Sequence, residues 1–299
     1  MLSVVVLLAF AACACDSFGR HGSFISRRQL NQKAQLGSPT GDESGVALAA
    51  QGIETVSGLK FFTLEGGMCP YAARTWICFL ELDMDYETVG INGLKKPEWY
   101  EEINPKGKVP AIQNLVDGSL VYESAICDEY LCDLAQSTDP DGPPGESKVW
   151  KLMPIGPGDR AALRLMNDHV DTEVCPAHFT FLMNKDGSRD EVLKDALEKA
   201  LVVLEDTLVS HGGPYLMGSE FTIADVHFLP FFLRLVVSLR YFKEYEVPSE
   251  KYPRLLQWLE ICSRRDSVKA ASPSDERIIE LYKKFVEAEY GFGGLNKNK

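Results

Sequence analysis

One segment of the chain limits its possible folds more than any other. Residues 222–242 read TIADVHFLPFFLRLVVSLRYF, and apolar side chains occupy nearly every position. A helix that is apolar on all sides is stable in water only when other elements surround it. Thr222 and Asp225 have the spacing of a capping box, which Phe221 and Val226 flank as a hydrophobic staple. We therefore predict a buried central helix, with a capping box that serves folding and not catalysis.

The segments around this helix show apolar residues at spacings of three and four, which indicates further helices. They are residues 159–183, 190–212, 252–265 and 275–290. We therefore predict an all-α C-terminal domain over residues 158–292, followed by a disordered tail at residues 293–299.

The preceding part of the chain alternates between strand and helix patterns. Strands are predicted at residues 59–64, 86–91, 109–113 and 119–122, and helices at 70–82, 96–103 and 124–134. The order is β-α-β-α-β-β-α, and it predicts a small α/β domain over residues 58–136. Residues 137–157 are rich in proline, glycine and aspartate, which is typical of a linker.

The first 57 residues have the composition of a targeting leader. An apolar run at residues 2–14 ends in small residues, as the core of a signal peptide does. Residues 17–41 then contain four basic and no acidic side chains, which is typical of a transit peptide. This bipartite pattern predicts import into a plastid, with secretion or a cytoplasmic location as alternatives. Residues 1–57 are not expected to join the fold.

Charge and cysteine content exclude several classes of function. The net charge of -12 argues against nucleic acid or anionic lipid as the main partner. Eight cysteines are too few and too scattered for a disulfide scaffold in 299 residues. The sequence contains no CxxC pair and no Cys/His cluster at zinc spacing, so no metal cofactor is expected. No stable membrane span is expected in the folded part.

The stretch MCPYAART places Cys69 directly before Pro70. Proline favours the first turn of a helix, so Cys69 is predicted at a helix N-terminus. Unpaired N–H groups and partial positive charge stabilise a thiolate there, with a pKa of roughly 3.5–7.5. Ala72 stands where a second cysteine would resolve a mixed disulfide, so the resolving thiol must come from outside, and glutathione is the obvious candidate. Taken alone, this position also suits a cysteine with no chemical role.

Two further motifs suggest a peptide-like ligand. Pro110 opens a strand, and a cis Val109–Pro110 bond would leave the N–H and C=O of Val109 available to an extended peptide. Only about 5–6% of X–Pro bonds are cis, so the sequence leaves the isomer open. Ser124 is placed to cap a helix and hold a carboxylate, and Glu123 to accept an ammonium group. An ordinary helix start is the alternative for these two residues.

The ordered motifs resemble a glutathione transferase over about residues 59–290. CPYAARTWI and the central helix are most similar to the lambda class, whereas KPEWYEEINPKGKVPAI and VYESAICDEYL are equally similar to omega. The resemblance implies a thioredoxin-like N-terminal domain and an all-α C-terminal domain. It also implies that glutathione is the co-substrate and that Cys69 is the catalytic residue. The implied glutathione-binding residues are Tyr71, Lys96, Val109, Pro110, Glu123 and Ser124.

Within this family, Lys96 would face the glycyl carboxylate of glutathione, and Val109 would pair with its cysteinyl part. Glu123 and Ser124 would hold the γ-glutamyl end. The implied activity is thiol transfer and deglutathionylation of small-molecule or protein mixed disulfides. A dehydroascorbate reductase and a non-catalytic ligand-binding member of the fold are the alternatives. The choice between lambda and omega, and between monomer and homodimer, stays open.

In the helical half, Met166, His169 and Phe179 are candidates for lining an acceptor pocket. Apolar and aromatic residues in helices are more often part of a core, and we expect that role for them.

Overall fold

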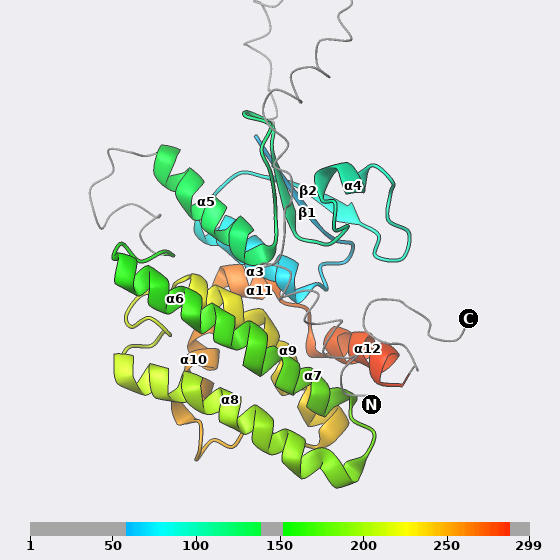
Figure 1. Ribbon diagram of the computed structural model, residues 1–299, viewed down its shortest axis with the longest axis vertical. Helices are drawn as coiled ribbons and strands as arrows, with labels where there is room; N and C mark the ends of the chain where they lie inside the picture. Colours follow the sequence, from blue (N-terminus) through cyan, green and yellow to red (C-terminus); the bar gives the residue numbers. More distant parts are fainter. Residues whose placement is uncertain (1–57, 139–151, 288–299) are drawn as a thin grey trace, which may run out of the picture.

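The computed structural model describes residues 58–138 and 152–287 of the chain (Figure 1). The predicted leader at residues 1–57, most of the predicted linker and the predicted tail lie outside these described residues. In Figure 1 the sheet and its helices lie above, and a group of helices lies below. Helix α3 (Pro70–Glu81) runs between the two parts and packs on both.

The N-terminal part is a four-stranded mixed sheet in the order β2-β1-β3-β4. Strand β1 (Leu59–Leu64) pairs parallel with β2 (Glu87–Ile91) and antiparallel with β3 (Ala111–Asn114), which pairs antiparallel with β4 (Leu120–Tyr122). The predicted order β-α-β-α-β-β-α is confirmed.

Alternate residues of β1 point to opposite faces of the sheet, as strand geometry requires. Phe61 joins the main core with Phe79 of α3, on the face that also packs against α5 (Ser124–Thr138). Phe62 points the other way and packs on Tyr100 of the short helix α4 (Tyr100–Ile103). Of the helix predicted at residues 96–103, only the last turn forms, as α4.

The C-terminal part is helical, as predicted. It contains α6 (Pro157–His169), α7 (Cys175–Met183), α8 (Asp190–His211), α9 (Ile223–Lys243), α10 (Pro253–Ser263), α11 (Asp266–Ala271) and α12 (Asp275–Val286). A π-helical turn, η3 (Val170–Val174), separates α6 from α7, so the single helix predicted at residues 159–183 is interrupted. Helix α11 was not predicted, because six residues are too few for a periodic pattern to emerge.

Helix α9 is the buried central helix that the apolar run predicts, with fifteen of its 21 residues buried. Asp225 in its first turn is fully buried and accepts four hydrogen bonds. They come from the N–H of Thr222 at 2.8 Å and its hydroxyl at 3.2 Å, the N–H of Leu216 at 2.9 Å and Nε1 of Trp258 at 2.7 Å. The capping box is thus confirmed, and its carboxylate also binds two other segments. Among the described helices, none combines the length and apolar character needed to cross a bilayer.

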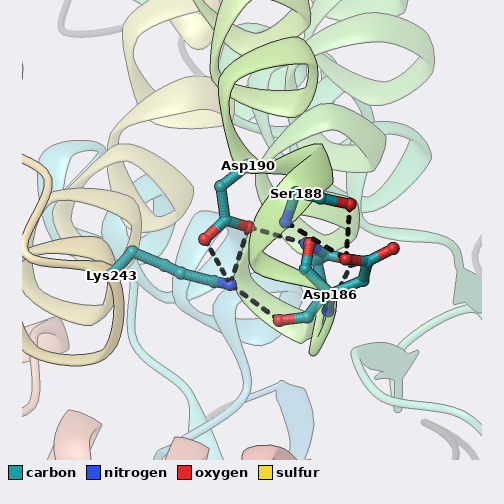
Figure 2. A network of polar contacts seen from close by, with 5 residues as sticks. Asp186, Ser188, Asp190 and Lys243 are labelled. Atoms are coloured by element: carbon teal, nitrogen blue, oxygen red, sulfur yellow. Dashed lines mark hydrogen bonds and ion pairs between the residues drawn. The ribbon is translucent and has the colours of Figure 1, made fainter.

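A polar network ties the loop between α7 and α8 to the end of α9 (Figure 2). Lys243 donates to the carbonyl of Asn184 at 2.7 Å and to the carboxylate of Asp190 at 3.0 Å. In the same loop, the exposed Asp186 accepts the backbone N–H of Ser188 at 3.1 Å. These contacts fix the start of α8 and lie in the helical part, away from the β-sheet.

The two parts of the fold are joined by an ion pair across α3 and the segment before α11. Arg265 donates two hydrogen bonds to Glu81, at 2.8 and 2.6 Å. Ser267 of α11 donates to the same carboxylate. Paired N–H···O bonds from one guanidinium fix orientation as well as distance. The helical part therefore holds α3 at a defined angle beneath the sheet.

A buried carboxyl in the α3–α5 contact leads to a pH-dependent prediction. Asp128 of α5 is fully buried and accepts the Thr75 hydroxyl at 2.7 Å. Burial raises the pKa of Asp128 to about 7, although the Thr75 hydrogen bond and the Arg74 charge oppose that shift. The folded protein therefore binds this proton more tightly than the unfolded chain, whose Asp pKa is about 3.9. Its contribution to stability then declines as pH rises from about 4 to about 7.

We expect Asp128→Asn to remove this decline. The difference in free energy of unfolding, variant minus parent, should therefore be about 2–3 kcal/mol larger at pH 8 than at pH 5, in favour of the folded variant. Urea unfolding at the two pH values measures the difference, and Asp133→Asn, an exposed carboxylate on the same helix, is the control. A difference for Asp128→Asn no larger than that of the control would contradict the prediction.

Candidate active site

The turn between β1 and α3 presents Cys69 at the start of the helix. Gly66 and Gly67 both have positive φ values, of 79° and 69°, which side chains with a Cβ rarely adopt. Cys69 is the N-cap residue of α3, and Pro70 follows in the first turn. The carbonyl of Cys69 accepts the N–H of Ala73 at 3.0 Å, and the first turn contains no acidic side chain. A thiolate at this position therefore faces the positive end of α3 with no nearby acidic residue in that turn.

The register of the sheet brings the predicted site residues to one end of it. Phe62 pairs with Ala111, and Ala111 pairs with Tyr122. The end of β1, the start of β3 and the end of β4 are thus neighbours. Cys69 follows β1, Val109 and Pro110 precede β3, and Glu123 and Ser124 follow β4, so the sheet gathers them.

Val109 lies next to the candidate nucleophile. The Cys69 thiol makes a long contact with the Val109 carbonyl, with Sγ 3.9 Å from the oxygen. The Val109–Pro110 peptide bond is cis, which the sequence left open. The preceding carbonyl, that of Lys108, accepts hydrogen bonds from the Tyr100 hydroxyl at 2.7 Å and from Asn104 Nδ2 at 2.6 Å. The loop that precedes β3 is therefore held in place by side chains of the α4 region.

Cys69 differs from the other cysteines that the structure describes. It is partly exposed, whereas the other five in the described ranges are buried. Burial raises the pKa of each of those five, Cys78, Cys127, Cys132, Cys175 and Cys262. A buried thiol with a raised pKa is a poor nucleophile. Thiol chemistry in the described part of the chain is therefore concentrated at Cys69.

The charged candidates lie around the same loop. Lys96 packs beside Gly107, where an added methyl group would come within 3.3 Å of the lysine Nζ. Glu123 has a positive φ of 73°, a conformation rarely adopted outside glycine. Its carboxylate accepts Lys106 Nζ at 2.9 Å. Sequence reasoning did not identify Lys106, since nothing in the local pattern connects it with a residue seventeen positions away.

Ser124 and Tyr71 meet a buried arginine. Ser124 is the first residue of α5 and is nearly buried, and its hydroxyl oxygen accepts Nη1 of Arg74 at 3.2 Å. The Tyr71 ring packs edge-on against Phe231 of α9, with centroids 4.8 Å apart, and the Arg74 guanidinium lies 5.1 Å from it. Tyr71 is thus placed at the contact between the two parts of the fold.

A second arginine, Arg234 of α9, approaches Cys69 from the helical part. Its side chain is almost fully buried and donates to the carbonyls of Pro230 at 2.7 Å and Met68 at 3.1 Å. Burial lowers the pKa of Arg234, and Tyr282 and Cys69 act in the opposite direction. That interaction is mutual, so the guanidinium charge favours the ionised form of Cys69. A charged residue inside an apolar run was the signal that sequence reasoning overlooked.

Of the three acceptor-pocket candidates, Phe179 has the expected core position, whereas Met166 and His169 are only partly buried. Phe179 is buried in the core and packs near Tyr282, with ring centroids 6.0 Å apart. Met166 packs against the same core, and His169 Nε2 lies 2.9 Å from the carbonyl of Ala200.

Comparison with known proteins agrees with this geometry. Residues 68–134 match the model of the glutathione S-transferase N-terminal domain, and residues 186–260 match that of the C-terminal domain. A probable maleylacetoacetate isomerase of Caenorhabditis elegans is 31% identical over 167 residues, which cover 54% of this chain and 72% of that protein. The chain belongs to the glutathione S-transferase family.

Two relatives from different transferase classes cover most of the described chain. Glutathione S-transferase omega-1 of Sus scrofa is 29% identical over 72% of this chain and 82% of its own length. Glutathione S-transferase DHAR2 of Arabidopsis thaliana is 26% identical over 74% of this chain and 92% of its own length.

The fold of this chain is also similar to solved structures of glutathione transferases. Glutathione transferase Omega 3C of Trametes versicolor superposes with a TM-score of 0.64 at 27% identity, over 77% of this chain and 91% of that one. The predicted glutathione transferase fold and the predicted enzyme family are therefore confirmed. The domain boundaries, the roles of single site residues and the plastid address stay predictions.

Proposed function

We propose that this protein is a glutathione-dependent thiol transferase that acts through a mixed disulfide between Cys69 and glutathione. The observation that carries the proposal is the position of Cys69. It is the one partly exposed cysteine of the described ranges, and it stands at the N-terminus of α3 beside the Val109 carbonyl. Membership of the glutathione S-transferase family and the likeness to omega-1 support glutathione as the co-substrate.

The proposed reaction has two exchanges. The Cys69 thiolate attacks the glutathionyl sulfur of a mixed disulfide, and the acceptor leaves as a thiolate that takes a proton from water. A second glutathione, as its thiolate, then attacks the glutathionyl sulfur on Cys69. Glutathione disulfide leaves, and the Cys69 thiolate is restored. Ala72 stands at the position of a resolving cysteine, so an external thiol is needed for the second exchange.

In the proposed complex, an extended glutathione lies along the end of the sheet. Val109 pairs with its cysteinyl backbone, next to Pro110, and Lys96 faces its glycyl carboxylate. Glu123 and Ser124 hold the γ-glutamyl group, and Tyr71 borders the site. For the ammonium group to reach Glu123, it must share or replace the contact that Lys106 makes.

Treating the purified protein with glutathione disulfide tests the proposal. We expect one glutathionyl group on the tryptic peptide that contains Cys69, and its release by added glutathione. Mass spectrometry before and after that addition measures both steps. Alkylation of Cys69 by iodoacetamide across pH should show an inflection below about 8. Modification at another cysteine, or an inflection above 8, would contradict the proposal.

Dehydroascorbate reduction is the second candidate, which the likeness to DHAR2 favours. It uses the same cysteine, so the two activities are separated by comparing turnover of dehydroascorbate with turnover of a glutathionylated peptide. A non-catalytic carrier would bind glutathione and turn over neither. The plastid location proposed for the leader at residues 1–57 rests on composition alone and concerns residues outside the described ranges.

A further inference from the structure

A buried cluster of charged residues lies directly behind the proposed γ-glutamyl site. Arg74 of α3 is 1% exposed and uses three of its nitrogens at once. Nη1 donates to Ser124 Oγ at 3.2 Å, Nη2 to Asp171 Oδ1 at 2.8 Å, and Nε to the carbonyl of His227 at 2.7 Å. Ser124 belongs to the N-terminal part of the fold, and the other two belong to the helical part. One guanidinium therefore connects the helical part to the start of α5.

The Asp171 carboxylate is held for this contact by its surroundings. It lies in the π-helical turn η3, between α6 and α7, and turns of this kind often occur at functional sites. Its Oδ1 is also 3.0 Å from Nε2 of the fully buried His227. Burial alone would raise the pKa of Asp171, but the charge of the Arg74 guanidinium outweighs that effect and holds the pKa well below its usual range. Burial lowers the pKa of His227, so Arg74 is the cation that Asp171 balances. Asp171 is therefore ionised and balances the Arg74 charge.

The hydrogen bond to Ser124 has a direct consequence for the serine proton. A guanidinium has five N–H donors and no acceptor, so Arg74 can only donate to the hydroxyl oxygen. The serine proton must then be donated to another group. A hydroxyl that accepts from a cation is also a stronger donor, because hydrogen bonds in a chain polarise one another. With the positive end of α5 beside it, this hydroxyl suits an incoming carboxylate.

The aromatic neighbours limit the movement of the guanidinium. Its Cζ lies 4.4 Å from the centroid of Phe231 and 5.1 Å from that of Tyr71. Both rings are within the range of cation–π contact, which is stronger where water is excluded. The planar guanidinium is thus held by two rings as well as by its three hydrogen-bond acceptors.

We propose that Arg74 is a positioning residue for glutathione binding. It directs the Ser124 hydroxyl toward the γ-glutamyl α-carboxylate and is itself held by Asp171 and His227 of the helical part. This inference rests on the proposed function, because it assumes that the start of α5 receives that carboxylate. Arg74 would then contribute to the affinity for glutathione, although it is buried and lies 50 positions from Ser124 in the sequence.

The test uses two probes that cannot form a disulfide. One is S-methylglutathione, and the other is the same molecule with its γ-glutamyl α-carboxylate converted to an amide. Titration calorimetry gives the Kd of both probes for the parent full-length protein, Arg74→Met, Ser124→Ala and the double variant. We expect Arg74→Met to raise the Kd for S-methylglutathione about tenfold, because a charge-assisted hydrogen bond to the carboxylate is lost. The Kd for the amide should rise less than about twofold. The double variant should be no weaker than the worse single variant, because the two residues act through one contact.

The result that overturns the inference is equal weakening of both probes by Arg74→Met, or no weakening of either. Equal weakening would assign Arg74 a purely structural role. Failure of the proposed function looks different. The parent protein would then bind the two probes equally well, if glutathione does not bind at the start of α5, or would form no disulfide between Cys69 and glutathione.

A second variant covers a failure of Arg74→Met to fold. Arg74→Lys keeps the charge, but one ammonium group cannot span three acceptors in a planar fork. We expect Arg74→Lys to raise the Kd for S-methylglutathione more than the Kd for the amide. The increase for S-methylglutathione should be smaller than the increase that Arg74→Met causes. An unchanged Kd for S-methylglutathione in Arg74→Lys would also contradict the inference, because the planar guanidinium would then not be needed to position Ser124.

Discussion

Replacing Cys69 with serine is expected to abolish disulfide exchange, with a loss on the order of 10³-fold or more. A serine hydroxyl is not ionised near neutral pH, and the other cysteines of the described ranges are buried with raised pKa values. Nothing else in the described site is placed to attack sulfur. Initial rates with a glutathionylated peptide and with a small disulfide measure the loss.

The same variant should gain conjugating activity toward electrophiles. In the parent protein Cys69 bonds to the sulfur of glutathione, whereas a serine hydroxyl can donate to a glutathione thiolate without forming a covalent bond. Cys262→Ala, which removes a buried thiol from α10, is the matched control and should keep its exchange rate. Unchanged exchange in Cys69→Ser would refute the proposed mechanism, and lost exchange in both variants would show an effect of cysteine removal on the fold.

Replacing Asp225 with alanine should lower the free energy of unfolding by about 3–5 kcal/mol, because buried donors without partners each cost about 1–3 kcal/mol. The variant would leave four buried donors without their acceptor: the N–H and the hydroxyl of Thr222, the N–H of Leu216 and Nε1 of Trp258. The total stability of a domain is usually about 5–15 kcal/mol, so this is a large fraction of it. Chemical unfolding followed by tryptophan fluorescence and circular dichroism measures the change.

Asp186→Ala is the control for Asp225→Ala. Asp186 also accepts a backbone N–H, from Ser188, but it is exposed in the loop of Figure 2, where water can replace it. We expect Asp186→Ala to cost much less stability than Asp225→Ala, because water can take the place of an exposed cap. A similar cost for both variants would mean that burial of the Asp225 carboxylate contributes nothing beyond ordinary capping.

Much of the fold could be predicted because its signals are local. The glycines, the cysteine and the proline of the stretch GGMCP mark the end of β1 and the start of α3, whatever packs on them. The apolar run and the spacing of Thr222 and Asp225 likewise predict a buried, capped α9. Where packing alters the local rule, the predictions were wrong. The π-helical turn η3 interrupts a continuous apolar pattern, and of the helix expected at residues 96–103 only Tyr100–Ile103 forms.

The sequence by itself determined that a cysteine stands at a helix N-terminus, with proline behind it and no second cysteine to resolve a disulfide. Those are relations between residues a few positions apart, which backbone geometry alone enforces. Only the tertiary structure decided what surrounds that sulfur. Arg234 reaches Met68 across 166 positions, and Arg74 reaches Asp171 across 97. Such contacts depend on how α3 packs against the helical part, and the periodicity of one element carries no information on its partners in another.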